Sequence, residues 1–166
     1  ALTEGWVRKA AQLQLLELLK ILQSLSPDPG TVACAILFDA QRNGADVSRW
    51  QEPPETIEQR LQELLRLKRV EQENRTQDAA TSAEGLRRLL LALVKDVRVV
   101  LIALAWQLAK LRLAKNDSEA AVALAEEAFL IHAPLANRLG VWQLKWEIED
   151  LAFRYKDPQS YQRIAS

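Results

Sequence analysis

The sequence predicts an all-α protein with a single domain. Apolar residues recur at helical spacing along most of the chain, and no segment shows the alternation expected of a half-buried strand. Glycine and proline number only 5 and 6 and sit at a few points, as in other helical proteins. With 166 residues, 49% of them hydrophobic, the chain is long enough for one ordinary domain with a sizeable core.

The first helix is predicted over residues 6–25. Its inward residues are expected to be Leu13, Leu16, Leu19 and Ile21 or Leu22. The sequence SPDPG ends this helix and starts the next, with Asp28 as the N-cap and Pro29 in the first turn. The second helix is apolar on nearly all sides through Leu37, so we expect it to be buried. Gly44 ends it.

An amphipathic third helix is predicted to open at Pro53 and Pro54. Its inward residues are expected to be Ile57, Leu61, Leu64 and Leu65. Residues 71–82 are polar and lack periodicity, which indicates a loop. Helix is predicted again from about Ser82 to Ala114, with a break near Asp96, which would cap a new helix.

The C-terminal part predicts further helices. One runs from Glu119 to about Leu139, and Pro134 should kink it because its ring removes a backbone hydrogen bond. Gly140 separates it from an amphipathic helix that extends to Tyr155. Another helix begins at Asp157-Pro158.

Charge and cysteine content argue against a nucleic-acid-binding module and against a secreted protein. The 22 basic and 22 acidic residues cancel, which argues against a nucleic-acid-binding module. Cys34 is the only cysteine and lies in an apolar run, so we expect a small buried hydrophobe and a cytoplasmic protein. Charges in residues 1–20 argue against a signal peptide. The chain has no methionine, so we expect it to be a fragment of a longer one.

Residue types that often carry chemistry give no recognisable site. His132 is the only histidine, and a zinc site of the usual His/Cys type would have to combine it with Cys34 at no known ligand spacing. We therefore interpret His132 as a helix residue near a kink. Apolar surroundings should raise the pKa of Cys34, which argues against a nucleophile. No metal ligand and no cofactor is predicted.

Two pairs of residues in the C-terminal part are interpreted structurally. Glu126 and Glu127 point to different sides of a helix, which is typical of a solvated surface. Trp142 and Trp146 are four residues apart and share a helix face. We expect them to pack in the core or at an interface rather than to form a stacking platform.

Two stretches carry a family resemblance: DVRVVLIALAWQLAKLR (96–112) and HAPLANRLGVWQLKWEIEDLAFRYKDPQSYQRIA (132–165). They resemble the long RelA/SpoT homologues, the bacterial synthetases and hydrolases of the alarmone (p)ppGpp. The second stretch departs from the family at its first position, where His132 stands in place of the usual Tyr. The resemblance implies an HD-domain-like helical bundle. In that family the domain holds manganese through a His, a His-Asp pair and a distant Asp, and removes pyrophosphate from the 3′ position. The bound metal lowers the pKa of a water molecule.

The resemblance also implies that this site has degenerated. The first His falls on Gln14. The His-Asp pair falls on Phe38 and Asp39, and the Glu-Asp pair that helps activate water falls on Arg42 and Asn43.

The distant Asp of the family falls on Trp106, and the Asn that follows it falls on Lys110. Of the four expected protein ligands only Asp39 remains, and one carboxylate does not hold manganese usefully. The pattern is similar to the synthetase-only branch of the family, RelA, whose hydrolase domain is degenerate.

The resulting hypothesis is a catalytically inactive pseudo-hydrolase domain over residues 1–140, followed by a helical connection over 141–166. The connection would lead to a missing synthetase domain of a GTP pyrophosphokinase, which transfers pyrophosphate from ATP to GTP or GDP in the stringent response. The domain would act structurally and regulate synthesis through contact with that neighbour. The resemblance implies that the parent protein acts on the ribosome, without direct nucleic-acid contact by this fragment.

Two alternatives stay open. The old site could bind a guanine nucleotide without metal, using Arg42, Lys110 and Arg112. The chain could also keep a residual manganese-dependent hydrolase activity with a rearranged metal site.

Overall fold

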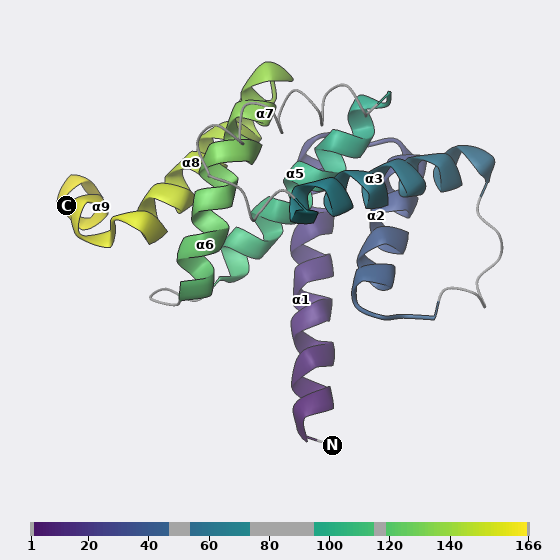
Figure 1. The fold of residues 1–166 in the computed structure, drawn as a ribbon, viewed down its shortest axis with the longest axis horizontal. Helices are drawn as coiled ribbons and strands as arrows, with labels where there is room; N and C mark the ends of the chain where they lie inside the picture. Colours follow the sequence, from purple (N-terminus) through teal and green to yellow (C-terminus); the bar gives the residue numbers. More distant parts are fainter. Residues whose placement is uncertain (1, 47–53, 74–94, 115–118, 166) are drawn as a thin grey trace.

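The structure is a computed structural model that describes residues 2–46, 54–73, 95–114 and 119–165. Every element in these ranges is helical, which confirms the predicted all-α class (Figure 1). The elements are α1 (Leu2–Ser24), α2 (Pro29–Arg42), α3 (Glu55–Glu73), α5 (Val97–Leu113), α6 (Glu119–Glu127), the π-helix η3 (Ala128–His132), α7 (Ala133–Arg138), α8 (Trp142–Lys156) and α9 (Pro158–Ala165).

The central element is α5, which contacts α1, α2 and α3 as well as α6, η3 and α8. Figure 1 shows α5 between these two groups of helices. It is buried on almost every side, because its sequence between Val99 and Leu111 is nearly all aliphatic. A helix that is apolar all round must be enclosed by other elements. The two groups therefore share one core along α5.

Two helix starts follow the sequence prediction. Asp28 caps α2 by accepting a hydrogen bond from the backbone N–H of Thr31 at 3.2 Å, and Pro29 lies in the first turn. The hydroxyl of Thr31 also donates to Asp28 and, as the largest cause, lowers the pKa of that carboxyl to about 2. Asp96 caps α5 in the same way, through the backbone N–H of Arg98. Gly44 follows α2 with φ +74°, a conformation that glycine adopts without strain.

The capping residues also join helices to one another. Arg60 on α3 donates to Asp96 at 2.8 Å and to Asp28 at 3.4 Å. Arg98 donates to Asp96 at 2.9 Å and lies 3.5 Å from Asp28. These charged residues connect the starts of α2 and α5 to α3, so the caps contribute to tertiary structure as well as to each helix.

The inward face of α1 differs from the prediction. Leu18, Ile21 and Leu22 are buried, whereas the side chains of Leu13 and Leu16 are 46% and 54% exposed. The N-terminal part of α1 extends beyond the other helices, so residues on its early turns have little to pack against (Figure 1). Periodicity identifies an apolar stripe but does not show where a partner helix ends.

The predicted loop over 71–82 is wrong for its first three residues, since α3 continues to Glu73. Residues 74–82 lie outside the described part of the chain. Glu71 is not a solvated loop residue but a buried one. Its position continues the inward face of α3, because it follows Leu64 and Lys68 at helical spacing.

Near Pro134, where a kink is predicted, the helix changes type. The segment η3 is a π-helix, and Pro134 lies in the first turn of α7, which follows it directly. A proline nitrogen has no hydrogen to donate, and a π-bulge accommodates the freed backbone groups. Gly140 then ends α7 with φ +71°.

Helix α8 packs on α5, α6 and α7 through Leu144, Ile148, Ala152 and Tyr155. The hydroxyl of Tyr155 donates to the backbone carbonyls of Leu111 at 2.9 Å and Ala114 at 3.1 Å, which ties α8 to the end of α5. No helix in the described ranges is both long and apolar enough to cross a membrane.

Candidate functional site

Trp106 is the centre of the candidate site. It lies in the middle of the buried helix α5, and only 7% of its surface is exposed. The ring of Phe38 from α2 meets it edge to face, with 5.4 Å between the ring centroids. Aromatic pairs prefer this geometry, because the positive edge of one ring approaches the negative face of the other. Two residues far apart in the sequence therefore form one aromatic unit between α2 and α5.

Asp39 follows Phe38 and lies beside this aromatic pair. It is almost completely buried, and its Oδ2 accepts a hydrogen bond from the side-chain amide of Asn43 at 3.1 Å. The same amide donates to the backbone carbonyl of Asp39 at 2.9 Å. Burial raises the pKa of Asp39, and the nearby indole of Trp106 and amide of Asn43 offset only part of this effect. Oδ1 of Asp39 and Nε1 of Trp106 have no hydrogen bond of good geometry.

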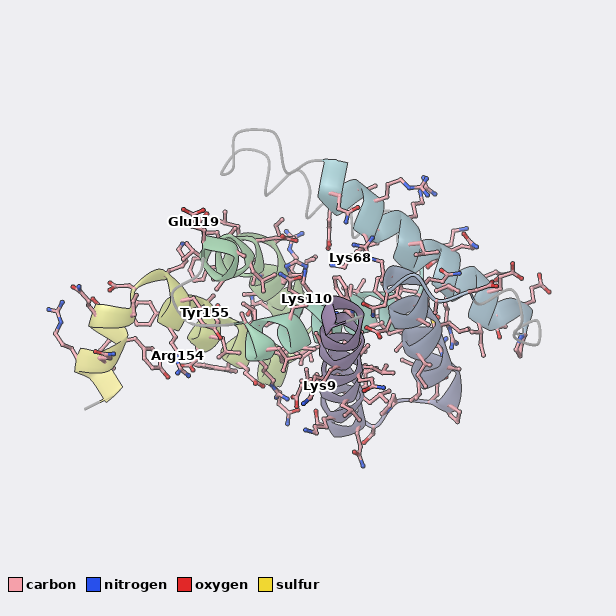
Figure 2. All side chains as sticks on the ribbon, turned by 90° about the horizontal axis from the view of Figure 1, so that it is seen from below. Lys9, Lys68, Lys110, Glu119, Arg154 and Tyr155 are labelled. Carbon is pink, nitrogen blue, oxygen red and sulfur yellow. The ribbon has the colours of Figure 1, made fainter. Side chains whose placement is uncertain are left out.

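Three cationic side chains lie over the indole of Trp106. The Nζ of Lys110 is 4.6 Å from the ring centroid, the Nζ of Lys68 is 5.1 Å away, and the guanidinium carbon of Arg42 is 5.7 Å away. Figure 2 shows Lys68 and Lys110 close to each other, although they come from α3 and α5. Each distance permits a cation–π interaction. The indole is therefore surrounded by three cationic groups, with Asp39 beside it and Glu71 paired to Lys68.

Most of the residues around Trp106 are positions that align with the hydrolase pattern. Phe38, Asp39, Asn43 and Trp106 come together with the cations Arg42 and Lys110, as the alignment of the hydrolase pattern would require. Gln14 is half-buried on α1, which packs along α5.

Arg112 faces a different direction from Lys110. Its guanidinium donates to Glu147 at 2.8 Å and to Glu17 at 3.2 Å, which links α5 to α8 and α1. Residues two positions apart on a helix project to nearly opposite sides. Arg112 is therefore part of an interhelical ion-pair network.

Lys68 was not identified from the sequence. It is buried on α3 and donates to Glu71 one turn later. The spacing of Leu61, Leu64 and Lys68 continues one helix face. A lysine that interrupts an apolar stripe was the available signal, because buried lysines are rare unless they are paired.

Cys34 is buried as expected, and burial raises its pKa to about 11. The thiol therefore stays protonated at neutral pH and does not act as a nucleophile. Trp142 and Trp146 lie on the outside of α8, 55% and 65% exposed, so they do not belong to the core. An interface remains the alternative that the sequence analysis allowed for them.

Comparison with known proteins shows which family this chain resembles. The HD domain family matches residues 9–142. The chain is 40% identical over 156 residues to a GTP pyrophosphokinase of Photobacterium angustum, which covers 90% of this chain and 21% of the relative. It is 38% identical over 155 residues to a GTP pyrophosphokinase of Escherichia coli, with the same coverage.

A further relative has a different activity in its name. A probable guanosine-3′,5′-bis(diphosphate) 3′-pyrophosphohydrolase of Synechocystis is 35% identical over 147 residues, which covers 88% of this chain and 19% of the relative. The chain thus spans about a fifth of the length of the curated relatives that it matches. The helical fold, the match over most of its length and these relatives together show that the chain belongs to the HD domain family, among the RelA/SpoT homologues.

Proposed function

We propose that this chain is a pseudo-hydrolase domain of a ppGpp synthetase, a GTP pyrophosphokinase, and that it regulates a synthetase domain instead of cleaving ppGpp. The observation that carries the proposal is the Trp106–Phe38 pair. In the hydrolase pattern these two positions hold metal ligands. Here a buried indole and a phenyl ring fill the space between α2 and α5, and neither ring has a lone pair to coordinate a metal.

The other aligned residues do not fit a manganese ion either. Asp39 supplies one carboxylate, and its raised pKa means that burial works against the charged form that a metal needs. Arg42, Lys68 and Lys110 lie around the same indole. The charges of Arg42 and Lys110 repel a divalent cation, whereas the charge of Lys68 is compensated by Glu71. Manganese also requires several oxygen or nitrogen ligands. The metal-dependent chemistry of the hydrolases therefore has no support in this group of residues.

The test is a hydrolysis assay. The purified chain is incubated with ppGpp and manganese, and release of pyrophosphate is measured over hours against a buffer control and an active hydrolase of the family. We expect release equal to the buffer control. Manganese-dependent release with turnover, abolished by Asp39→Asn, would show instead that the chain is a residual hydrolase with a rearranged site.

A second candidate function is metal-independent binding of a guanine nucleotide. It is favoured by the cations around Trp106, which would meet phosphate groups. Arg112 is paired with Glu17 and Glu147, and Lys68 is paired with Glu71, so a phosphate would have to compete with these carboxylates at both residues.

Calorimetric titration with ppGpp and with GDP tests the binding function. Binding should weaken several-fold in Lys110→Met and stay unchanged in Lys20→Met, since Lys20 is exposed on α1. Absence of any saturable heat with wild-type protein would remove this candidate and leave the purely regulatory role.

The regulatory role needs a surface for the neighbouring domain, and α8 offers one. Its inner face packs on α5, α6 and α7, while Trp142 and Trp146 stand out on the other side. Two exposed tryptophans one turn apart are typical of an interface. We propose that residues 141–166 connect to the synthetase domain and that this face contacts it.

In the longer cytoplasmic protein, Trp146→Ala should change the rate of ppGpp synthesis while leaving the helical content of the domain intact. Leu16→Ala, at another exposed apolar residue, on α1, is the control and should have no effect. Equal synthesis rates in all three proteins would contradict the contact.

A further inference from the structure

A second group of charged residues lies next to Lys68, apart from the aligned hydrolase positions. Glu71 is on the last turns of α3, Glu127 ends α6, and His132 ends η3. The ligand atoms of these three residues all lie within 4.8 Å of one another. His132 is completely buried, the side chain of Glu71 is 3% exposed, and Glu127 is half-buried. Such burial is unusual for two carboxylates and an imidazole.

Two side-chain atoms of this cluster face each other in the interior. Oε1 of Glu71 and Nε2 of His132 lie 3.3 Å apart, which makes them an ion pair when the imidazole is protonated, and neither atom has a hydrogen bond of good geometry. Buried polar atoms without partners are rare in folded proteins and call for an explanation. In a tetrahedral zinc site with bonds of about 2.0–2.2 Å, neighbouring ligand atoms are separated by roughly 3.3–3.6 Å. The spacing of Oε1 and Nε2 is that of two ligands of one metal ion.

The π-helix explains how Glu127 joins them. On a regular α-helix, residues five apart do not share a face, because successive side chains rotate by 100°. In η3 the i→i+5 backbone pattern of a π-helix brings position 132 back over position 127. Nδ1 of His132 lies 3.4 Å from the backbone carbonyl of Glu127, and an imidazole that ligates a metal usually donates its other N–H to such a group.

Lys68 lies beside the cluster. Its ammonium bonds to Oε2 of Glu71 at 2.5 Å, whereas Oε1 of Glu71 faces Nε2 of His132.

We propose that Glu71, Glu127 and His132 form a binding site for zinc. One imidazole and two carboxylates suit a borderline transition metal, and water would complete a tetrahedron. Magnesium and calcium prefer a shell of oxygen ligands alone. The ion would join the end of α3 to the junction of α6 and α7. It would therefore clamp the two groups of helices that flank α5 at a point away from α5 itself.

The test is a zinc titration of the untagged, chelator-treated chain by isothermal calorimetry. We expect one zinc ion per chain with a micromolar or lower dissociation constant and a matching rise in melting temperature. His132→Tyr, which introduces the usual residue of the family, and Glu71→Gln should each weaken binding at least tenfold. Glu126→Gln, at the exposed neighbour of Glu127, and Cys34→Ser should bind as wild type does. No saturable binding, or equal binding by His132→Tyr, would overturn the proposal.

Two further measurements keep the proposal testable if a variant folds poorly. Cobalt added to wild-type protein should give the visible absorption of a tetrahedral nitrogen and oxygen site without a thiolate band, and a thiolate band would contradict the assignment. Lys68→Met should strengthen zinc binding several-fold, because Glu71 would lose its competing cation. Weaker zinc binding in a Lys68→Met protein that keeps its helical circular dichroism would also overturn the site.

Discussion

Trp106 lies on the central helix between the ring of Phe38 and three cationic side chains, and helix formation alone does not require an aromatic residue there. Its flanking residues Leu104, Ala105 and Leu108 are fully buried and keep the register of α5. The indole therefore enters the same space that a ligand at this position would reach. We interpret Trp106 as the residue that replaces a metal and its water by packed apolar volume.

Replacing this indole by a carboxylate tests that interpretation. Trp106→Asp should cost about 3–5 kcal/mol in the free energy of unfolding, because it opens a cavity and buries a polar group in it. Denaturant unfolding curves measure the difference. Trp146→Asp is the matched control on an exposed surface and should change stability by less than about 1 kcal/mol. If the two substitutions had equal small effects, Trp106 would not fill the core, and an open cleft would replace our description.

Asp39 gives a prediction about pH. Its pKa is raised by burial, so the native state favours the protonated form, and the wild-type protein loses stability as the pH rises through that pKa. Asp39→Asn should therefore be more stable than wild type at pH 7, and the advantage should shrink as the pH falls toward 3.8, the ordinary value for Asp. Melting temperatures across this range measure it, with Asp150→Asn on the exposed face of α8 as the control. An advantage that is independent of pH would contradict the assigned cause.

At the scale of elements, helix starts were the most predictable features. Asp28 and Asp96 cap α2 and α5 as expected, because capping is local chemistry between a side chain and the next turn. The inward face of α1 was predicted less well, since burial depends on the length of the partner helix. The π-helix η3 was foreseen only as a kink at Pro134, because a missing proline N–H predicts a disturbed helix but not the form that the disturbance takes.

Leu18 is buried and Leu16 is exposed on the same helix, so alanine substitutions at the two positions should differ in their effect on stability. Leu18→Ala should cost about 2–5 kcal/mol, because Leu18 is fully buried in the core. Leu16→Ala, two residues earlier on the same helix, should change stability by less than about 0.5 kcal/mol. Thermal or denaturant unfolding of the two variants gives the comparison. Equal destabilisation would show that the early turns of α1 are covered by another surface in solution.

For the whole molecule, periodicity and composition were sufficient to predict the helical class, and the aligned pattern predicted that Phe38, Asp39 and Trp106 would meet. Neither predicted the cluster of Glu71, Glu127 and His132, whose members lie up to 61 positions apart and depend on a π-helix for their spacing. Lys68 joins the two groups, since it contacts Trp106 on one side and Glu71 on the other. The aligned hydrolase position and the cluster of Glu71, Glu127 and His132 are thus neighbours.

The aligned hydrolase position, with Phe38 and Trp106 in place of ligands, should not hold manganese. Electron paramagnetic resonance tests it directly, because free manganese gives a six-line signal that weakens on binding. The titration is made with His132→Tyr protein, so that the proposed zinc site does not contribute. We predict that the signal of added manganese stays that of the free ion up to millimolar concentration. Saturable loss of the signal at one ion per chain, reversed by Asp39→Asn, would contradict the account.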